Sequence, residues 1–506
     1  MAKADLIATL MAPPSPSGAE LSALPSPVGL LEIRADLVGD LNPEWLRANF
    51  KGQLIYALRS REAGGESSDS PSERQRRFLN AAPYYDRIEL EANKDCSPKL
   101  LEQISTEQRI ISWYGPGCDL SELKARFAEL CLVPAANYKL ICRTEKISDE
   151  FTPLQLLKSL SRSDTIAYAE GPMGFWSRLV ALHLGAPAIY GAVSHGALVP
   201  GEPTINKLID DYALPELRPL KEIFAIIGSP VFHSLSPRLH NAAYREMNYP
   251  GLFLPLQVEH FEEFWESVVR SRVFDSLGLS LNGMTVASPH KEAALQTANK
   301  VSPMARQAES ANILVRNNGY WIADTTDPEV IYMASRERNV NVNRKRAAVI
   351  GCGGAGRAIA AALVQSGAGV TLVNRGAERG NHAAELLSLP YLPLPNFDAE
   401  GYDIVVNATP VGRDTDEVPF EVDRLNEDAV VIDLVYGTRP TPLVGSILGR
   451  EQIVIDGRDV LLTQVHRQFQ MMTGKDMSPI IAPETLGQTN TPATANVAET
   501  ISLRSS

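Results

Sequence analysis

The first 212 residues alternate between short apolar strands and amphipathic helices, and this alternation restricts the fold more than any other feature. Strands are expected near residues 5–11, 28–35, 52–58, 84–90, 109–113, 136–141, 164–169 and 187–191. Eight consecutive strand–helix units predict a closed parallel (β/α)8 barrel over residues 4–212, because short right-handed crossovers leave few other ways to cover both faces of the sheet.

A second α/β pattern follows the barrel. Residues 210–220 carry charges and two prolines, which is typical of a linker. An apolar strand is then expected at 223–228, and another at 347–350 opens a glycine-rich turn. Regular structure is expected to end near Gly474, and the Thr- and Ser-rich tail, residues 483–506, is predicted to be disordered.

Charge and cysteine content exclude several classes of function. With 48 basic and 60 acidic residues the net charge is -12, which disfavours binding to nucleic acid or to an anionic membrane. The five cysteines form no Cys-x-x-Cys pair, so neither a disulfide framework nor a metal site is expected, and the chain is predicted to be cytoplasmic. No uncharged apolar run is long enough to span a membrane, and residues 6–12 are predicted to form a strand, not a secretion signal.

The glycine-rich turn predicts a dinucleotide site. Gly351, Gly353, Gly354 and Gly356 lie between a β-branched strand and an Ala-rich helix, where the backbone must turn sharply and a pyrophosphate must approach the helix N-terminus. After the next strand, Asn374 and Arg375 stand where an NAD site would have an acidic residue, so NADP is the expected cofactor. The alternative for the glycines is a tight turn that binds no ligand. The alternative for Arg375 is an exposed arginine on a solvated turn.

Two further polar clusters are unusual for a purely structural region. Ser234 and Ser236 lie on a turn into a predicted helix. The second cluster is the sequence PHK, which ends at Lys291, together with TTD, which ends at Asp327. Reduction of a ketone requires a proton donor at the developing alkoxide, and an ammonium group paired with a carboxylate provides one without a metal. Taken singly, each residue could instead be a surface charge or a helix cap.

Together with the glycine turn, these clusters closely resemble the shikimate dehydrogenase family over residues 223–474. The matching motifs are, in order, SLSP with HN at 234–241, PHK at 289–291, AN at 311–312, TD at 326–327, GCGGAGRA at 351–358, NR at 374–375, NATPVG at 407–412, the segment 433–436, TPL at 441–443 and Gln464. The resemblance implies a two-lobed α/β unit, with a substrate-binding domain at 220–335 that is completed by about 460–480 and an NADP-binding Rossmann domain at 340–458.

The resemblance also implies roles for individual residues. Ser234 and Ser236 would bind the shikimate carboxylate, and Lys291 and Asp327 would form the catalytic dyad. Further substrate contacts would come from Thr285, Asn312, Tyr436 and Gln464. NADP would be held by Gly351, Gly353, Gly354, Ala355, Gly356, Asn374, Arg375 and Thr409. Thr285, Ala287, Ile313 and Thr325 depart from the family pattern, which leaves quinate as the alternative substrate.

Charged residues also gather at the carboxyl ends of the barrel strands, where barrel enzymes place their chemistry. Lys139 lies within an otherwise apolar strand, where an ammonium is costly unless it is paired or functional. Desolvation would lower its pKa and favour imine formation, whereas the alternative is an ion-paired or snorkelling lysine.

The predicted barrel resembles type I 3-dehydroquinate dehydratases over residues 5–204. ELRxD appears at 32–36, Arg59 precedes Gly64 and Gly65, and GPMGFWSR ends at Arg178. The resemblance implies a Schiff base at Lys139 and substrate contacts from Glu32, Arg34, Arg59 and Arg178. In this order of domains, the chain resembles the bifunctional dehydratase–dehydrogenases of plants, in which the first reaction supplies the substrate of the second.

The barrel departs from the dehydratase pattern at several positions. Tyr114 stands where the family has its catalytic histidine, and a phenol with an ordinary pKa of about 10 is a poor base near neutral pH. Glu89 replaces an aspartate, while Leu198 and Glu202 replace a serine and a glutamine. We therefore expect imine formation with impaired or redirected dehydration, or, as the alternative, a non-catalytic or regulatory barrel.

Overall fold

The computed structural model describes residues 2–171, 174–194, 201–437, 439–450 and 452–478, together with Thr485. The predicted tail, residues 483–506, and Leu198 lie outside these residues, apart from Thr485. The chain divides into two compact units, Met1–Ile223 with Pro250–Leu281, and Phe224–Tyr249 with Asn282–Ser506. The domain limits expected from the sequence stay a prediction. In the described part, no helix is long and apolar enough to cross a membrane.

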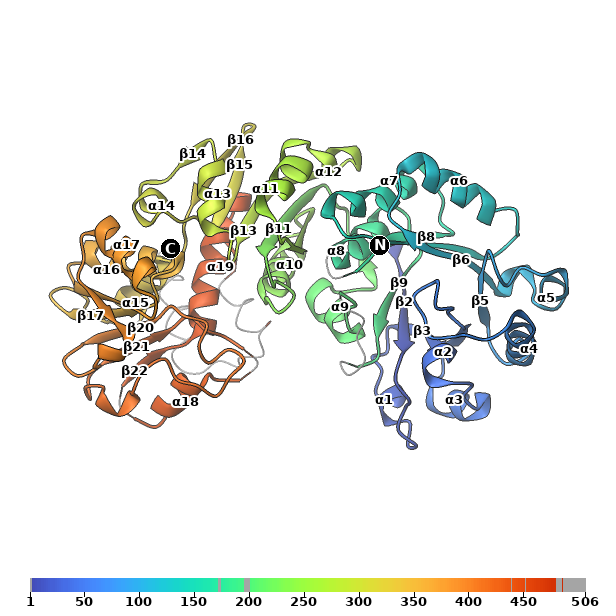
Figure 1. The fold of residues 1–506 in the computed structure, drawn as a ribbon, viewed down its shortest axis with the longest axis horizontal. Helices are drawn as coiled ribbons and strands as arrows, with labels where there is room; N and C mark the ends of the chain where they lie inside the picture. Colours follow the sequence, from blue (N-terminus) through green and yellow to red (C-terminus); the bar gives the residue numbers. More distant parts are fainter. Residues whose placement is uncertain are drawn as a thin grey trace, which may run out of the picture. The chain divides into compact units, whose positions relative to one another are not determined.

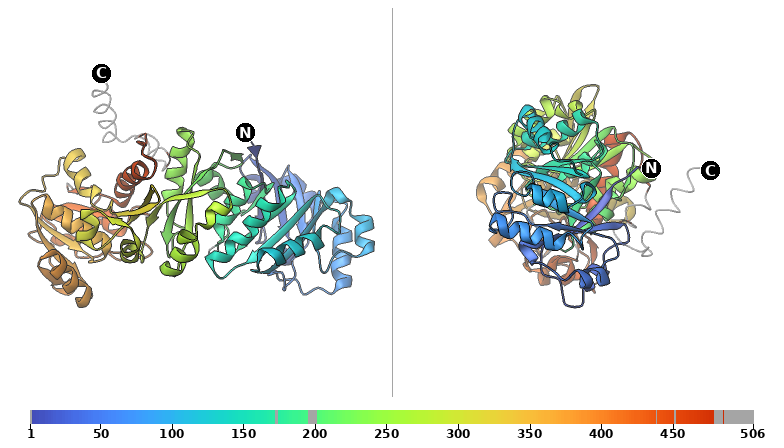
Figure 2. Two further views of the ribbon diagram at one scale, coloured as in Figure 1. Left: turned by 90° about the horizontal axis from the view of Figure 1, so that it is seen from above. Right: turned by 90° about the vertical axis from the view of Figure 1, so that its right-hand side faces the viewer.

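The first unit is built on an eight-stranded parallel sheet (Figures 1 and 2). Its strands are β2 (Asp5–Leu10), β3 (Val28–Arg34), β4 (Gln53–Ala57), β5 (Arg87–Glu91), β6 (Arg109–Pro116), β7 (Asn137–Arg143), β8 (Thr165–Glu170) and β9 (Ala188–Ala192). The order β8-β7-β6-β5-β4-β3-β2-β9 curls the sheet into a barrel. No ladder joins β8 to β9 within the described residues, so the predicted barrel is confirmed as nearly closed rather than fully closed.

Helices follow the strands of this barrel. They are α1 (Ala19–Ser22), α2 (Ala35–Val38), α3 (Pro43–Asn49), α4 (Pro71–Ala81), α5 (Pro98–Gln103), α6 (Leu120–Leu130), α7 (Phe151–Leu160), α8 (Phe175–His183) and α9 (Ile205–Tyr212), with short 3-10 turns at Thr106–Gln108 and Ile147–Glu150. Asn42, Ser70 and Ser97 each accept hydrogen bonds at a helix start, and proline occupies the first turn that follows.

The linker expected at 210–220 is partly regular structure, and this expectation was therefore too simple. Helix α9 continues to Tyr212, and β10 (Glu216–Leu217) pairs antiparallel with β1 (Ala2–Lys3). The prolines and charges predicted a linker. The strand β10 was not recognised, because a strand of two residues shows no periodicity and forms only by pairing with β1 at the other end of the barrel segment.

A six-stranded mixed sheet has the order β12-β11-β13-β15-β16-β14. Its strands are β11 (Glu222–Gly228), β12 (Gly251–Gln257), β13 (Ser280–Val286), β14 (Lys300–Val301), β15 (Ile313–Asn317) and β16 (Tyr320–Asp324). The accompanying helices are α10 (Ser236–Glu246), α11 (Phe261–Phe264), a π-helical turn at Trp265–Arg270, α12 (Val273–Ser276), α13 (Lys291–Thr297), α14 (Pro303–Ala308) and α15 (Glu329–Glu337).

The second six-stranded sheet is fully parallel and has the order β19-β18-β17-β20-β21-β22. It consists of β17 (Arg346–Ile350), β18 (Gly369–Asn374), β19 (Tyr391–Pro393), β20 (Ile404–Asn407), β21 (Val430–Asp433) and β22 (Ile453–Ile455), with α16 (Gly354–Gln365), α17 (Ala377–Leu387), α18 (Pro442–Ile447) and α19 (Gly457–Thr473), and with 3-10 turns at Leu394–Asn396 and Val422–Arg424. Apolar clusters cover both faces. The strand order reverses between β17 and β20, where such sheets bind ligands at their carboxyl edge.

Candidate active sites

Lys291 and Asp327, the predicted dyad, form a direct ion pair. Lys291 begins α13, and Asp327 lies between β16 and α15. The Lys291 Nζ donates to the Asp327 Oδ2 at 2.7 Å. The lysine side chain is 20% exposed whereas the aspartate is 3% exposed, so the ammonium is the member of the pair that a ligand can reach.

Polar side chains hold the Asp327 carboxylate in one orientation. Asn312 Nδ2 and Gln464 Nε2 donate to its Oδ1 at 3.0 and 2.9 Å. Thr325 Oγ1 donates to Oδ2 at 3.4 Å. The structure thus brings Asn312 and Gln464, which were predicted as substrate contacts, together with the dyad and adds Thr325. Their contacts with a substrate stay a prediction. A carboxylate with this many donors is fixed and stays ready to pair with the ammonium.

The predicted substrate-binding serines lie at the start of α10 and are buried. The Ser236 backbone N–H donates to Ser234 Oγ at 3.2 Å. Tyr436, from the loop after β21, hydrogen-bonds the side chain of Ser234, and burial raises the pKa of this tyrosine. Thr285 is buried on β13 and donates to the Ala225 carbonyl at 3.5 Å. The contacts therefore group Ser234, Ser236 and Tyr436 directly, but not Thr285.

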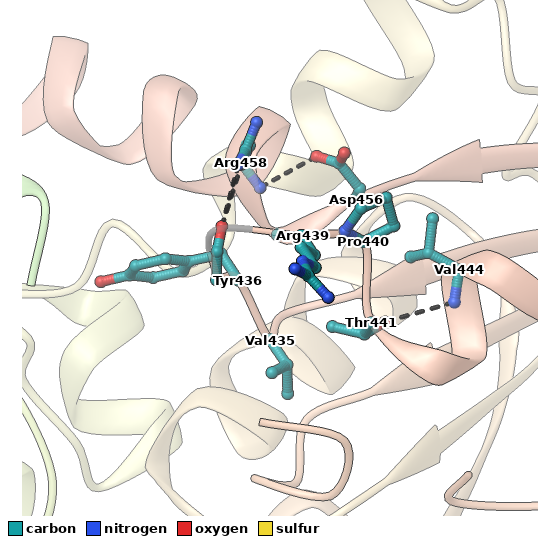
Figure 3. A pocket seen from close by; sticks show the side chains of 10 residues that line it. Val435, Tyr436, Arg439, Pro440, Thr441, Val444, Asp456 and Arg458 are labelled. Atoms are coloured by element: carbon teal, nitrogen blue, oxygen red, sulfur yellow. Dashed lines mark hydrogen bonds between the residues drawn. The ribbon is translucent and has the colours of Figure 1, made fainter. Parts of the chain in front are cut away.

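A pocket opens beside Tyr436, between the loop after β21 and the start of α19 (Figure 3). Arg439, Asp456 and Arg458 also line it. The Arg458 guanidinium donates to the Gly437 carbonyl at 3.0 Å, and its backbone N–H donates to Asp456 Oδ1 at 2.9 Å. Neither arginine was predicted from the sequence. Arg439 closely follows the Asp433–Tyr436 segment, which was a signal for that residue, whereas Arg458 meets this loop only in the folded chain.

The glycine turn between β17 and α16 has the geometry of a phosphate-binding turn. Gly351 has φ +105°, and a Cβ there would lie 2.8 Å from the Ala408 carbonyl oxygen. A Cβ on Gly356 would lie 1.8 Å from the Gly351 carbonyl oxygen. A Cβ on Gly353 would meet nothing within 4 Å, so the turn faces open space at the helix N-terminus. These residues fit a pyrophosphate group.

The same turn lies against the dyad. A Cβ on Gly354 would be 2.1 Å from Ser310 Oγ and 3.4 Å from Lys291 Cδ. The side-chain stem of Lys291 therefore passes directly beside the N-terminus of α16. Two motifs that are far apart in the sequence meet here, as a hydride transfer site requires.

Other predicted cofactor residues surround the turn. Asn374 Oδ1 accepts from the Cys352 N–H at 3.2 Å, and Thr409 Oγ1 donates to Asn407 Oδ1 at 2.7 Å. Ala355 lies in the first turn of α16, and Arg375 is exposed directly after β18. Their contacts with a cofactor stay a prediction.

Arg357 is a buried residue of this motif that the sequence analysis did not single out. Its guanidinium donates to the carbonyls of Ala308, Cys352 and Glu309 at 2.8, 3.3 and 3.1 Å, and to Glu292 Oε1 at 2.8 Å. It therefore ties α16 to the segment after α14 and to the residue next to Lys291. The arginine at a fixed place in GCGGAGRA was the available signal.

In the barrel, Lys139 is 1% exposed and doubly paired. Its Nζ lies 2.9 Å from Glu89 Oε2 and 3.3 Å from Glu32 Oε1, and 3.8 Å from the centre of the Tyr190 ring. Burial acts to lower its pKa, but the two carboxylates outweigh burial and raise the pKa above its ordinary value. The expectation of a lowered pKa was wrong, because it considered desolvation without the partners.

Tyr114, at the position of the expected histidine, is buried between charges. Its hydroxyl donates to Glu89 Oε1 at 2.6 Å and accepts from Arg59 Nη2 at 3.0 Å. Burial raises the pKa of Tyr114 well above its ordinary value. Although burial opposes it, the charges of Lys139 and Arg59 lower the pKa of Glu89 to about 2. At neutral pH, Tyr114 is therefore a neutral phenol that donates a hydrogen bond, and Glu89 is the ionised carboxylate that accepts it.

The barrel arginines predicted to bind substrate all have acidic neighbours. Arg34 makes a bidentate pair with Asp36 at 2.8 and 2.7 Å. Arg59 Nη1 lies 3.6 Å from Glu170 Oε1, and Arg178 Nη1 lies 3.7 Å from Glu202 Oε1. Arg34 shares no hydrogen bond with the Lys139 group in the described residues. Glu170 and Tyr190 were not predicted from the sequence, because their roles depend on contacts across the barrel.

Comparisons with known proteins agree with this arrangement. The family model described as type I 3-dehydroquinase matches residues 15–217, the shikimate dehydrogenase substrate binding domain matches 226–314, and the coenzyme F420-dependent NADP oxidoreductase family matches 346–437. A shikimate dehydrogenase (NADP(+)) of Syntrophobacter fumaroxidans is 34% identical over 255 residues, which are 49% of this chain and 86% of that protein.

The chain belongs to the shikimate dehydrogenase family. Its dehydrogenase half follows a type I 3-dehydroquinase domain, and two relatives span both parts. The chloroplastic bifunctional 3-dehydroquinate dehydratase/shikimate dehydrogenase of Arabidopsis thaliana is 26% identical over 88% of this chain and 77% of that protein. The shikimate biosynthesis protein AroDE of Chlamydia pneumoniae is 24% identical over 89% of this chain and 91% of that protein.

Proposed function

We propose that the chain is an NADP-dependent shikimate dehydrogenase, which reversibly reduces 3-dehydroshikimate to shikimate in the pathway to aromatic amino acids. The observation that carries this proposal is the position of the Lys291–Asp327 pair beside the glycine turn. An ammonium with a fixed carboxylate partner then lies next to the site of a nicotinamide cofactor. Such a site can move a proton and a hydride at the same carbon–oxygen bond.

The residues of this chain handle the proton. In the direction of reduction, Lys291 donates a proton to the oxygen of the developing alkoxide, and Asp327 keeps the ammonium in place. Asn312 and Gln464 fix the orientation of Asp327. Ser234 and Ser236 supply hydroxyls for the carboxylate of the substrate. In the reverse direction the pair accepts the hydroxyl proton.

NADP supplies or accepts the hydride when it is bound. The open space at Gly353 fits its pyrophosphate, and the exposed Arg375 after β18 suits its 2′-phosphate, because a guanidinium makes charge-assisted bonds to phosphate. Asn374 accepts a hydrogen bond from the Cys352 N–H within the turn, and Thr409 lies beside Gly351.

The direct test is an assay of the full chain with NADP and either shikimate or quinate, following formation of the reduced cofactor. Faster turnover of shikimate with NADP is the expected result. Faster turnover of quinate would make the chain a quinate dehydrogenase, and no reaction with either substrate would overturn the proposal.

The 3-dehydroquinase domain provides a second candidate activity, a Schiff-base dehydration. Its support is Lys139, buried at the centre of the barrel among ionised groups. We propose that dehydration of 3-dehydroquinate is impaired, because Tyr114 is held as a phenol and cannot act as the base. A turnover assay with 3-dehydroquinate that gave ordinary rates would contradict this.

The partners of the chain are small molecules. We propose in addition that it binds no nucleic acid, since its net charge is -12, and that it is cytoplasmic, since all five cysteines are free. Retention on a nucleic-acid column at physiological salt would contradict the first part.

A further inference from the structure

The cations around Lys139 are already neutralised by carboxylates of the barrel itself. Lys139 pairs with Glu32 and Glu89, Arg59 lies 3.6 Å from Glu170, and Arg178 lies 3.7 Å from Glu202. Among the described residues of this cluster, the carboxylates therefore outnumber the cations by one.

Because these charged side chains are buried, the excess of carboxylates affects which ligands can bind. The side chains of Arg59, Glu170, Arg178 and Glu202 are 9%, 13%, 4% and 8% exposed. Solvent screens such charges little, so a further negative charge would meet repulsion and would lose its hydration. A ligand carboxylate at Arg59 or Arg178 would have to share the guanidinium with a glutamate that already neutralises its charge.

The cluster nevertheless has unused hydrogen-bonding atoms. Arg59 Nε, Arg178 Nε and the Tyr190 hydroxyl are buried and have no hydrogen-bond partner within the described residues. Tyr190 faces the Lys139 ammonium across 3.8 Å, so its hydroxyl belongs to the same site. Donors of this kind can be satisfied by the hydroxyl groups of an uncharged ligand.

We propose that the barrel site takes an uncharged polyhydroxylated carbonyl compound in preference to a carboxylate-bearing one, and binds it as an imine of Lys139. This inference rests on the Schiff-base chemistry proposed above. The Lys139 ammonium and the carbonyl condense to an iminium, and the carbonyl oxygen leaves as water with two of the three ammonium protons. The nitrogen group carries one positive charge before and after, so its pairs with Glu32 and Glu89 persist.

The test compares two probes of nearly equal shape, 3-dehydroquinate and its carboxamide, which lacks the negative charge. Each is incubated with the full chain and borohydride, which reduces an iminium to a stable amine, and the labelled peptide is identified by mass spectrometry. We expect the amide to label Lys139 at least about tenfold faster than the acid, the effect of roughly 1.4 kcal/mol of charge repulsion. Equal or faster labelling by the acid would overturn the proposal, and so would an absence of labelling by both probes.

Charge-removing variants make the test specific. Glu202→Gln and Glu170→Gln each remove one carboxylate with little change of shape, and each should speed labelling by the acid without speeding labelling by the amide. Glu73→Gln, on the outer helix α4, is the matched control and should change neither rate. A preference for the amide that survived both site variants would contradict the charge argument. Shikimate oxidation, assayed on the same samples, reports the dehydrogenase proposal separately.

Discussion

Arg375 is the residue on which the choice between NADP and NAD is expected to depend. It is exposed directly after β18, where a 2′-phosphate would lie. Arg375→Gln should raise the KM for NADP about 10- to 100-fold, the value of one or two lost charge-assisted hydrogen bonds, and should leave the KM for NAD nearly unchanged. Steady-state kinetics with both cofactors measure this. Arg450→Gln, at another exposed arginine of the chain, is the control, and an equal effect there would contradict a specific role.

Glu150 gives a prediction for the dependence of stability on pH. It is fully buried, accepts from the Trp176 indole N–H, and burial raises its pKa to about 8 from an ordinary value of 4.5. The folded state thus keeps a proton that the unfolded state loses. The stabilisation is complete below pH 4.5 and is lost as the pH rises to about 8.

Glu150→Gln should therefore reduce the fall in melting temperature across this pH range, because an amide does not ionise. Thermal unfolding of both proteins at several pH values measures the difference. Glu145→Gln changes an exposed residue nearby and should leave the pH dependence as it is. If the melting temperature of Glu150→Gln depended on pH as that of the native protein does, the Glu150 carboxyl would not be the cause of this pH dependence.

Lys139 shows which site properties local sequence can predict. Its place in an apolar strand correctly indicated a buried, unusual lysine. The direction of its pKa shift could not be predicted, because Glu32 and Glu89 lie 107 and 50 positions away in the sequence and meet it only across the barrel. The glycine turn was more predictable, since its constraints act between neighbours in the chain.

At the scale of elements, Arg357 is expected to keep α16 in register with the segment that carries the dyad. Arg357→Lys keeps the charge but loses the fork of donors. Its kcat should fall about 10- to 100-fold while both KM values change little, because small misplacements of a reacting group are costly. Arg450→Lys, at an exposed arginine that pairs with Asp423, is the matched control and should leave kcat nearly unchanged.

A positioning role requires that the Arg357 variant remains folded. Circular dichroism and melting temperature check this. If the variant lost activity only because less of the protein was folded, and the kcat of the folded fraction was unchanged, the proposed role would be contradicted.

Elements with strong periodicity were predictable. The eight barrel strands lie within a few residues of their expected positions, because the apolar pattern of a strand is set by neighbours in the sequence. The pairing of β10 with β1 was not predictable, since two-residue strands are defined only by their partner.

At the scale of the whole molecule, the two proposed activities are consecutive, because dehydration of 3-dehydroquinate would form the 3-dehydroshikimate that the dehydrogenase reduces. If the barrel is impaired, the full chain should oxidise NADPH slowly with 3-dehydroquinate but rapidly with 3-dehydroshikimate. Addition of a separate dehydroquinate dehydratase should restore the rate with 3-dehydroquinate. A fast reaction without the added enzyme would show that the barrel is fully active.

The most direct measurement is the rate of shikimate oxidation by the Asp327→Asn variant at saturating NADP. Since the amide cannot hold Lys291 by an ion pair, kcat should fall about 100- to 10,000-fold while the variant remains folded. Asp324→Asn, on the neighbouring strand β16, should retain most of the activity. Oxidation of shikimate at the native rate by Asp327→Asn would contradict the account.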